Sequence, residues 1–289
     1  MDFVIAGAQK AASTTLYELL RQHPDIAMPA TKEVQFFTQG DCFRMGAAYL
    51  DTYRRGARVG ALFGLADVQI MYVPEAAARC AAVNPAMRIL VVLRNPVDRA
   101  YSAYWFARSR GFEDAHTFEE ALDREAAREA GDYHTRGALT YVAHGRYAEQ
   151  LERLGAAVGR DNVLVFRYED LVADPATCAK RAFAWLGVAV DATIATRVHA
   201  NPTGQPRLRM LQRLIVASSL RRLASRVLGT GVKYWARRHV LVPLLDRNLK
   251  REPYPVMRSD TRQRLVAYFR PWNARLREQL GADLSSWDR

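Results

Sequence analysis

A short apolar run, a loop of small residues and an amphipathic stretch open this chain, and their order constrains the fold more than any other feature. The apolar run over residues 3–6 ends at Gly7, and the loop that follows contains Lys10 and closes with hydroxyl residues at 13–15. The amphipathic stretch begins at Leu16. A strand, a loop and a helix N-terminus in this order can hold phosphate, because backbone N–H groups and the positive end of the helix dipole converge there. The sequence therefore predicts an α/β fold with a phosphate site after its first strand.

The loop differs from the phosphate loop of nucleotide hydrolases. That motif, G-x-x-x-x-G-K-[ST], aligned on Gly7 would need glycine at position 12 and lysine at position 13, where this chain has Ala12 and Ser13. Its lysine comes three positions earlier, at Lys10. We therefore expect a phosphate site that is not built for a γ-phosphate with magnesium. A glycine that only makes a tight turn is the alternative at this point.

Along residues 1–204, apolar runs alternate with stretches of helical periodicity. The runs over residues 3–6, 59–65, 89–93 and 163–166 are typical of buried strands. The periodic stretches predict helices over residues 14–22, 74–82, 97–108, 117–130, 147–154 and 176–186. Strands that alternate with helices indicate a parallel sheet covered on both faces, which is a three-layer α/β fold.

We expect a single domain over residues 1–289. Its α/β core would end near residue 204, and a mainly helical, basic extension over 205–289, without a clear strand, would pack on that core. Two helix starts carry capping signals: Thr117 followed by Glu120 fits a capping box, and Asp174 precedes a proline at the first helical position.

A second group of residues follows the predicted strand 89–93. The strand ends in Arg94, where a nucleotide hydrolase has an aspartate that holds magnesium. Pro96 can start a helix that carries Ser102, so both Arg94 and Ser102 are predicted near the carboxyl edge of the sheet, where open α/β folds bind ligands. An arginine with a hydroxyl is a good phosphate receptor. A salt-bridged arginine at a strand end is the alternative, which the joint occurrence of these residues disfavours.

These motifs resemble those of the sulfotransferases that use 3′-phosphoadenosine 5′-phosphosulfate (PAPS). The segment Gly7–Leu16 is similar to their loop for the donor 5′-phosphosulfate, and Arg94-x-Pro-x-x-Arg99-x-x-Ser102 is similar to their 3′-phosphate motif. Further segments resemble the heparan-sulfate branch and its bacterial relatives: 23–26, 32–37, 145–147, 168–171, 201–204 and 281–287. Two segments depart from the pattern: Ala11 and Ala12 occupy positions where many relatives have glycines, and residues 65–72 lack a lysine found in the heparan-sulfate enzymes.

The resemblance implies a role for individual residues. Lys10 would stabilise the leaving oxygen and Glu33 would act as the general base, each as a catalytic residue, while Gln35 and Trp105 would contact the acceptor. The donor would be bound by the first loop, the 3′-phosphate motif and a closing loop, at positions Gly7, Ala8, Gln9, Lys10, Ala11, Ala12, Ser13, Thr14, Thr15, Arg94, Ser102, Gly204 and Arg207. His116, His134 or His144 could replace Glu33 as base, because another branch of these enzymes uses histidine.

The net charge of +12 is concentrated in one segment. Residues 205–251 contain twelve basic residues and a single acid, Asp246. Such a segment attracts polyanions or an anionic membrane surface, and the alternative is a solvated helical face. We predict peripheral contact with anionic membrane and no nucleic-acid partner, because no nucleic-acid motif accompanies the charge.

Three cysteines without a CxxC pair suggest neither a disulfide framework nor a zinc site. The first predicted strand begins at residue 3, which leaves no room for a signal peptide, and no apolar run approaches the ~20 residues of a membrane span. We therefore expect a cytoplasmic, metal-independent enzyme that transfers sulfuryl from PAPS to a hydroxyl of a carbohydrate, glycolipid or secondary metabolite. The alternatives are a P-loop kinase or NTPase and a non-catalytic polyanion-binding protein.

Overall fold

The computed structural model describes residues 1–54, 56–196, 205–206, 249–250 and 254–289. The chain divides into two compact units. The first comprises residues 1–99, 144–201 and 263–289, and the second comprises residues 100–143 and 202–262.

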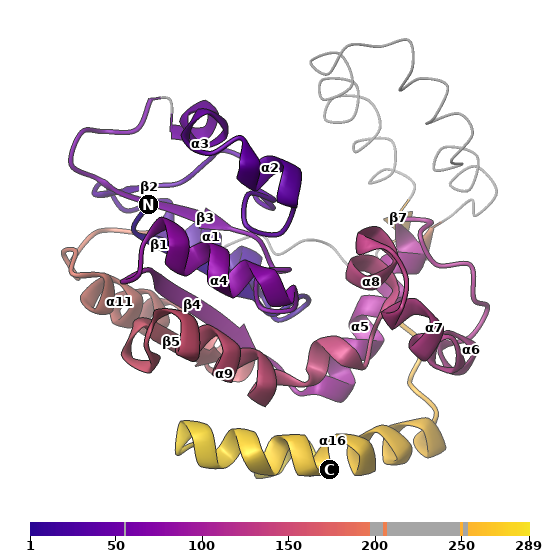
Figure 1. Cartoon of the computed structure of the whole chain (residues 1–289). Coiled ribbons are helices and arrows are strands. Elements are labelled where there is room, and N and C mark those ends of the chain that lie inside the picture. The colour runs from indigo at the N-terminus through magenta and orange to yellow at the C-terminus, as the bar shows by residue number, and fades with distance from the viewer. Residues whose placement is uncertain (55, 197–204, 207–248, 251–253) are drawn as a thin grey trace. The chain divides into compact units, whose positions relative to one another are not determined.

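A parallel sheet of five strands forms the centre of the first unit (Figure 1). The strands are β1 (Phe3–Gly7), β2 (Ile26–Ala27), β3 (Leu62–Ala66), β4 (Arg88–Leu93) and β5 (Val163–Arg167), in the order β2-β3-β1-β4-β5. The predictions over 3–6, 89–93 and 163–166 are confirmed. The run over 59–65 becomes a strand only from Leu62, because Gly60 has a positive φ of 85° and Val59 is 98% exposed. The two-residue strand β2 is too short to leave a pattern in the sequence.

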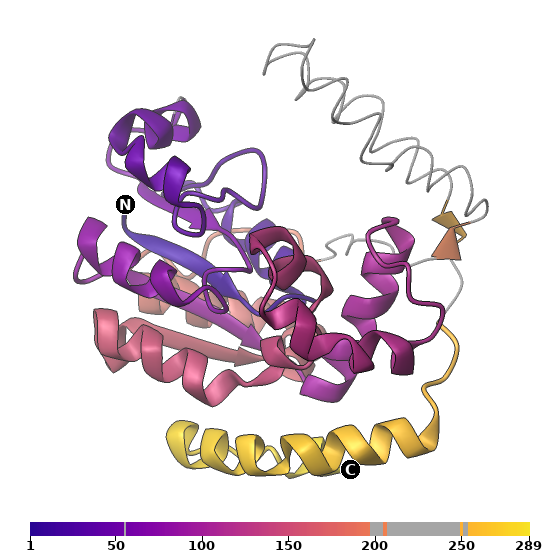
Figure 2. The same cartoon turned by 45° about the vertical axis from the view of Figure 1, so that its right-hand side comes forward.

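Helices flank this sheet (Figure 2). Helix α1 (Ser13–Leu20) packs against α11 (Pro175–Leu186), and α4 (Pro74–Val83) packs against α9 (Tyr147–Val158). Connections from β1 and from β3 run in opposite directions across the sheet, and right-handed crossovers then place these two helix pairs on opposite faces. The predicted three-layer α/β class is therefore confirmed.

The central strands are buried on both faces, which explains their continuous apolar sequences. Every residue of β1 is buried, and Phe3 pairs with Gly64 of β3. A Cβ atom built on Gly64 would lie 2.1 Å from Cζ of the Phe3 ring, so the aromatic ring occupies the space that a side chain at position 64 would take. Full burial of a side chain such as Phe3 stabilises the fold by about 1.5–3 kcal/mol.

A long helix, α16 (Ser259–Leu280), confirms helix in the predicted C-terminal extension. Its residues in the first unit contact the β4–β5 connection: Phe269 is fully buried and lies where a Cβ on Gly145 would fall, and Arg275 forms an ion pair with Glu152 of α9. The 3₁₀ turn Ser285–Asp288 then buries Trp287, whose ring meets Tyr147 edge-on.

Several short elements carry no signal that sequence periodicity can detect. They are α2 (Gly40–Arg44), α3 (Ala47–Arg54), α10 (Tyr168–Ala173) and the 3₁₀ turns Ala143–Gly145 and Arg160–Asn162. The expectation of no strand after residue 205 is wrong in one detail, since β6 (Gln205–Pro206) pairs antiparallel with β7 (Leu249–Lys250). The basic segment between β6 and β7 lies outside the described residues.

The described part of the second unit before residue 143 is also mainly helical. Its helices are α5 (Pro96–Ser109), which enters this unit at Ala100, α6 (Phe118–Asp123), α7 (Glu125–Glu129) and α8 (Tyr133–Leu139). The single helix predicted over 117–130 is thus divided at Arg124. Its predicted cap is confirmed, because the Thr117 hydroxyl accepts the N–H of Glu120 at 3.1 Å.

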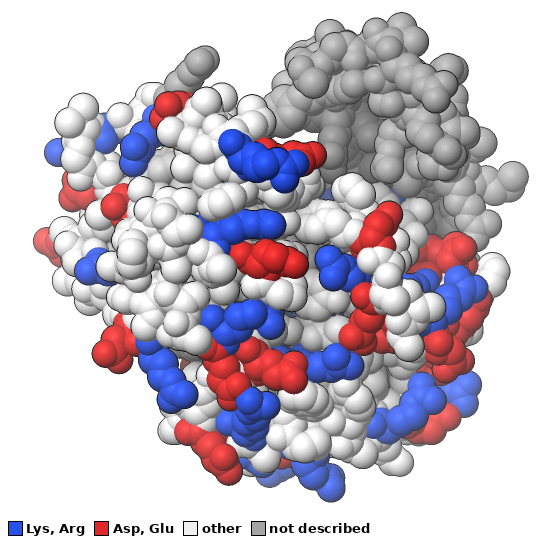
Figure 3. All heavy atoms as spheres, in the orientation of Figure 1, with Lys and Arg blue, Asp and Glu red and all other residues white. Residues whose placement is uncertain are grey.

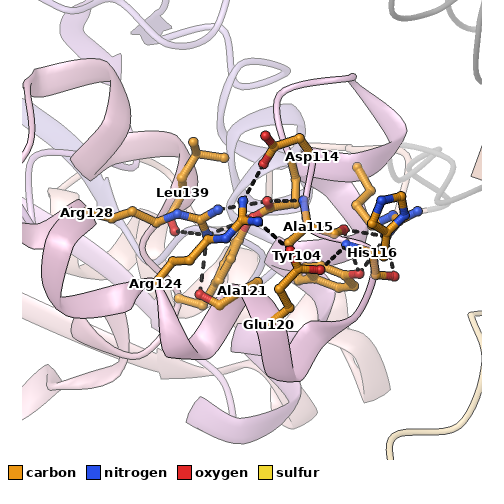
Figure 4. Close-up of polar contacts among 12 residues, drawn as sticks. Tyr104, Asp114, Ala115, His116, Glu120, Ala121, Arg124, Arg128 and Leu139 are labelled. Carbon is orange, nitrogen blue, oxygen red and sulfur yellow. Dashed lines mark hydrogen bonds and ion pairs between the residues drawn. The ribbon is translucent and has the colours of Figure 1, made fainter.

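Hydrogen bonds and ion pairs of arginine side chains connect the turns of the second unit (Figure 4). Arg108 donates to the carbonyls of Ala115 and His116, and Arg124 pairs with Asp114 and Glu120. Arg128 is buried and makes two hydrogen bonds of 2.8 Å to the carboxylate of Glu113, which also accepts the hydroxyl of Tyr141. Burial is tolerable for this ion pair because both partners are hydrogen-bonded.

Candidate active site

The loop between β1 and α1 has an unusual backbone. Lys10 and Ala12 have φ angles of 65° and 64°, in the left-handed region that favours glycine. Gly7 makes the turn out of β1, and a Cβ there would lie 3.1 Å from Cβ of Met71. The two alanines of the motif therefore differ: Ala12 adopts the conformation that glycine would take, and Ala11 does not. The loop leads directly into the first turn of α1, where the N–H of Thr15 donates to the carbonyl of Ala12 at 2.9 Å.

The loop meets Arg94 at the carboxyl edge of the sheet. Adjacent strands β1 and β4 continue in opposite directions, and such a switch point is where open α/β sheets bind ligands. Arg94 follows β4 directly, and its guanidinium donates to the carbonyl of Lys10 at 3.2 Å and lies over the ring of Tyr168 at 4.6 Å. The carbonyl of Arg94 accepts the hydroxyl of Tyr147 at 2.9 Å, and burial raises the pKa of Tyr147 to about 12. The structure thus brings together the first loop and the first residue of the second motif.

A second lysine connects this loop to Glu33. The ammonium group of Lys32 lies 3.0 Å from the hydroxyl of Ser13 and 2.7 Å from a carboxylate oxygen of Glu33. Its side chain is only 16% exposed. Sequence reasoning missed Lys32, although its position beside Glu33 was a signal that could have identified it. Lys10 in the loop and Lys32 beside Ser13 therefore supply positive charge around the β1–α1 loop.

The end of β3 holds Glu33 in place. The backbone N–H of Glu33 donates to the carbonyl of Ala66 at 2.8 Å. The carboxylate oxygen of Glu33 that does not contact Lys32 accepts the N–H of Val68 at 3.1 Å. Glu33 has a φ of 63°, a conformation that costs a non-glycine residue roughly 1–2 kcal/mol. Strained backbone that the surrounding structure maintains is frequent at functional sites. The side chain is 43% exposed, so an acceptor molecule could reach it.

Arg99 is a further charged residue of this region, and the sequence analysis did not include it among the donor-binding residues. It is fully buried, and its guanidinium lies 3.5 Å from the side-chain oxygen of Gln9 in the first loop. The motif Arg94-x-Pro-x-x-Arg99 contained it, so the sequence carried the signal. Gln9 therefore contacts a buried cation behind the loop.

The remaining residues of the donor set occupy different parts of the chain. Ala8 is buried, and its N–H donates to the carbonyl of Val92 at 2.7 Å, which fastens the loop to β4. Thr14 and Thr15 lie in the first turn of α1. Ser102 is a buried residue of α5 within the second unit. Gly204 and Arg207 lie outside the described residues.

The predicted acceptor residues belong to different units. Gln35 lies in a turn of the first unit, where its side-chain oxygen accepts the amide of Gln39 at 2.8 Å. Trp105 belongs to the second unit and stacks on Tyr254, with ring centroids 5.6 Å apart and planes at 10°. Both side chains are half-buried.

Of the three histidines that could replace Glu33, His144 alone lies in the same unit as Glu33. His116 and His134 are exposed residues of the second unit. His144 is buried, lies 3.2 Å from the side-chain oxygen of Gln69 and stacks on Tyr72 at 3.7 Å. Its ring therefore packs against the segment that follows β3.

The described residues outside this site carry charges of both signs. On the face drawn in Figure 3, basic and acidic side chains of the described residues are interspersed. Within the described ranges there is no group of three or more His, Cys, Asp or Glu residues arranged to hold a metal ion. In the same part of the chain, no helix combines the length and apolar character needed to cross a membrane.

Comparison with known proteins gives a consistent result. A model of the sulfotransferase domain matches residues 1–209. The chain is similar to a bifunctional heparan sulfate N-deacetylase/N-sulfotransferase 4 of Mus musculus, with 27% identity over 99% of this chain and 31% of that protein. It is also similar to a heparan sulfate glucosamine 3-O-sulfotransferase 6 of the same species, with 27% identity over 99% of this chain and 73% of that protein.

One solved structure is similar to this chain over its whole length. The crystal structure of a sulfotransferase from Alicyclobacillus acidocaldarius has a TM-score of 0.73 and 27% identity, covering 100% of this chain and 98% of that one. The chain spans about a third of the length of the curated relatives that it matches first.

Proposed function

This chain belongs to the sulfotransferase domain family, and on that premise we propose that it transfers a sulfuryl group from PAPS to a hydroxyl of a carbohydrate or glycolipid. One observation supports the proposal: Arg94, which follows β4, donates to the carbonyl of Lys10 in the β1–α1 loop, at the switch point of the sheet. A cation occupies the place where nucleotide hydrolases have their metal-binding aspartate. This favours a donor bound without magnesium and disfavours the kinase or NTPase alternative.

The residues present suit a donor with two anionic groups. Lys10, Lys32 and Arg94 supply cations, and the first turn of α1 supplies backbone N–H groups for a phosphate. Ser13, which is buried beneath Lys32, supplies a hydroxyl. We assign the 5′-phosphosulfate to the β1–α1 loop. The 3′-phosphate is assigned to Arg94, and a part for Ser102 of the second unit stays a prediction from the sequence.

The chemical step needs alignment, a base and stabilisation of the leaving oxygen. Glu33 takes the proton of the acceptor hydroxyl, whose oxygen forms the new bond to sulfur while the bond between sulfur and the bridging phosphate oxygen breaks. Lys10 stabilises the negative charge that develops on that leaving oxygen. The ammonium group of Lys32 contacts Ser13 and Glu33. When PAPS binds, this group can leave the Glu33 carboxylate and pair with the sulfonate of the donor. The products are the sulfate ester, 3′-phosphoadenosine 5′-phosphate (PAP) and one proton on Glu33.

The acceptor class is inferred from the relatives. Their names specify heparan sulfate and its glucosamine, so a glucosamine-containing oligosaccharide is the first acceptor to test. Glycolipids and secondary-metabolite alcohols are the next. Peripheral contact of residues 205–251 with anionic lipid, and a cytoplasmic location, stay predictions from the sequence.

Calorimetry with PAP and with ATP plus magnesium tests the donor assignment. We expect PAP to bind more tightly, and tighter binding of ATP with magnesium would refute the sulfotransferase assignment. Transfer of radiolabelled sulfate from PAPS then tests the residues. Glu33→Gln should lower kcat by about 10²–10⁴-fold and Lys10→Met by about 10²-fold, while PAP still binds Glu33→Gln. Lys180→Met is the matched control, because Lys180 is an exposed residue of α11 and should leave kcat unchanged.

A further inference from the structure

Tyr168 lies beside Arg94 because the two residues follow neighbouring strands. Strands β4 and β5 pair in parallel, and Leu93, the last residue of β4, pairs with Arg167, the last residue of β5. Arg94 and Tyr168 are therefore the first residues after the sheet on adjacent strands. The guanidinium carbon of Arg94 lies over the Tyr168 ring, 4.6 Å from its centroid. The segment 168–171, which has no part in the proposed function so far, thus contacts the residue to which the 3′-phosphate is assigned.

The backbone that carries the Tyr168 ring is fixed at the start of α10. Tyr168 is the first residue of this helix and is half-buried. The guanidinium of the preceding residue, Arg167, makes hydrogen bonds of 2.9 and 2.6 Å to the two carboxylate oxygens of Asp170. Leu171, the next residue after Asp170, is fully buried. Contacts on both sides of Tyr168 therefore hold its ring at the carboxyl edge of the sheet.

The guanidinium of Arg94 is held by groups that do not neutralise its charge. It donates to the carbonyl of Lys10 at 3.2 Å and lies over the Tyr168 ring. Among the residues that the structure describes, the contacts of Arg94 include no ion pair with a carboxylate. A carboxylate would compete with a bound phosphate, whereas an aromatic ring attracts a cation through its quadrupole and carries no charge. A guanidinium also has more N–H donors than the Lys10 carbonyl uses, so others can bind an anion.

We propose that Tyr168 is a positioning residue for Arg94, whose guanidinium it holds at the switch point of the sheet in place to bind the 3′-phosphate of the donor. This proposal rests on the proposed function, because it uses the assignment of the 3′-phosphate to Arg94. An arginine side chain that is free to rotate loses this freedom when it binds a ligand, which weakens binding. The Tyr168 ring confines the guanidinium before the donor arrives, so only ligands with a 3′-phosphate should bind more tightly because of it.

Calorimetry with two nucleotides tests the proposal. PAP carries the 3′-phosphate, and adenosine 5′-monophosphate (AMP) is the same nucleotide without it. We expect Tyr168→Leu to bind PAP about tenfold more weakly than the wild type and AMP equally well, because loss of a cation–π contact has an effect of this order. Tyr168→Phe keeps the ring and should bind both nucleotides as the wild type does. Val172→Ala, at an exposed position of α10, is the matched control and should change neither affinity.

Steady-state kinetics separates positioning of Arg94 from a general structural effect. The 3′-phosphate is remote from the bond that breaks, so Arg94 should bind it equally in the ground state and in the transition state. Loss of such uniform binding raises KM without lowering kcat. Tyr168→Leu should therefore raise KM for PAPS by about tenfold and leave kcat nearly unchanged.

NMR of the free protein keeps this proposal distinct from the proposed function. The ring current of residue 168 should shift the Arg94 side-chain signals upfield in the wild type and in Tyr168→Phe, but not in Tyr168→Leu. If this shift is present but the wild type binds PAP no more tightly than AMP, the proposed function fails, while the hold of Tyr168 on Arg94 is supported. Absence of the shift from the wild type overturns the proposal.

Two outcomes of calorimetry also overturn it. One is that Tyr168→Leu keeps the wild-type affinity for PAP. The other is that Tyr168→Leu weakens PAP and AMP equally, because the ring would then contact a part that both nucleotides share. Tyr168→Met, which also lacks the ring, provides the same comparison if Tyr168→Leu does not fold.

Discussion

Replacing Ala11 and Ala12 separately by glycine should change the stability in opposite directions. Ala12 has a φ of 64°, and this left-handed conformation costs an alanine roughly 1–2 kcal/mol. Glycine removes that cost, although it loses about 0.5–1 kcal/mol through the greater freedom of the unfolded chain. Ala12→Gly should therefore raise the free energy of unfolding by about 0.5–1 kcal/mol.

The neighbouring residue is the matched control. Ala11 is fully buried and does not have a positive φ. Ala11→Gly gains nothing from relief of strain and loses about 0.8 kcal/mol for the buried methyl group in addition to the entropic cost. It should lower the free energy of unfolding by about 1.5 kcal/mol, so the two variants should differ by about 2 kcal/mol.

Urea unfolding followed by circular dichroism measures this difference, and calorimetry with PAP shows whether the loop still binds. We expect Ala12→Gly to bind PAP as the wild type does, because glycine can adopt the conformation already present. If Ala12→Gly destabilises the protein as much as Ala11→Gly does, the reasoning from the loop backbone is wrong.

Three further predictions concern buried residues. Folding buries Asp67 and raises its pKa from 3.8 to about 7, so between these pH values the folded state keeps a proton that the unfolded chain releases. The free energy of unfolding should therefore fall by about 4 kcal/mol as the pH rises from about 4 to 7. Urea unfolding at pH 4 and pH 8 should show this loss in the wild type and a smaller one in Asp67→Asn. Glu113→Gln leaves the buried guanidinium of Arg128 without its carboxylate and should cost about 3–5 kcal/mol, which thermal unfolding would detect as an early transition involving the second unit. Gly64→Ala forces a methyl group into the ring of Phe3 and should lower the free energy of unfolding by about 1–3 kcal/mol. Adding Phe3→Leu should recover part of that loss in a double-mutant cycle. If the effects of the two substitutions are additive, the predicted contact is contradicted.

The fold class and half of the site could be predicted because their signals are local. Continuous apolar runs identify β1, β4 and β5, and a parallel sheet brings the carboxyl ends of its strands to one edge, where the sequence predicts Arg94 and Ser102. In the structure Arg94 donates to the carbonyl of Lys10 in the loop after β1. The beginning of the run over 59–65 was predicted three residues too early, because the apolar pattern includes Val59, which is exposed and precedes the strand.

Other parts of the site depend on contacts between distant segments. Nothing in the sequence near Glu33 indicates that it bonds to Ala66 and Val68, since these residues meet only when β3 pairs beside β1 and residues 33–34 bond to its end. The same holds for Lys32, which reaches Ser13 across the β1–α1 loop.

The sequence by itself determined the layered α/β fold, the position of the loop between β1 and α1 and the family, because apolar periodicity and short motifs are properties of neighbouring residues. Only the tertiary structure decided which alanine of the loop adopts the left-handed conformation and how far burial raises the pKa of Asp67. The physical reason is that φ angles in a turn and the ionisation of a buried acid depend on the atoms packed around them. Residues far apart in the chain supply those atoms.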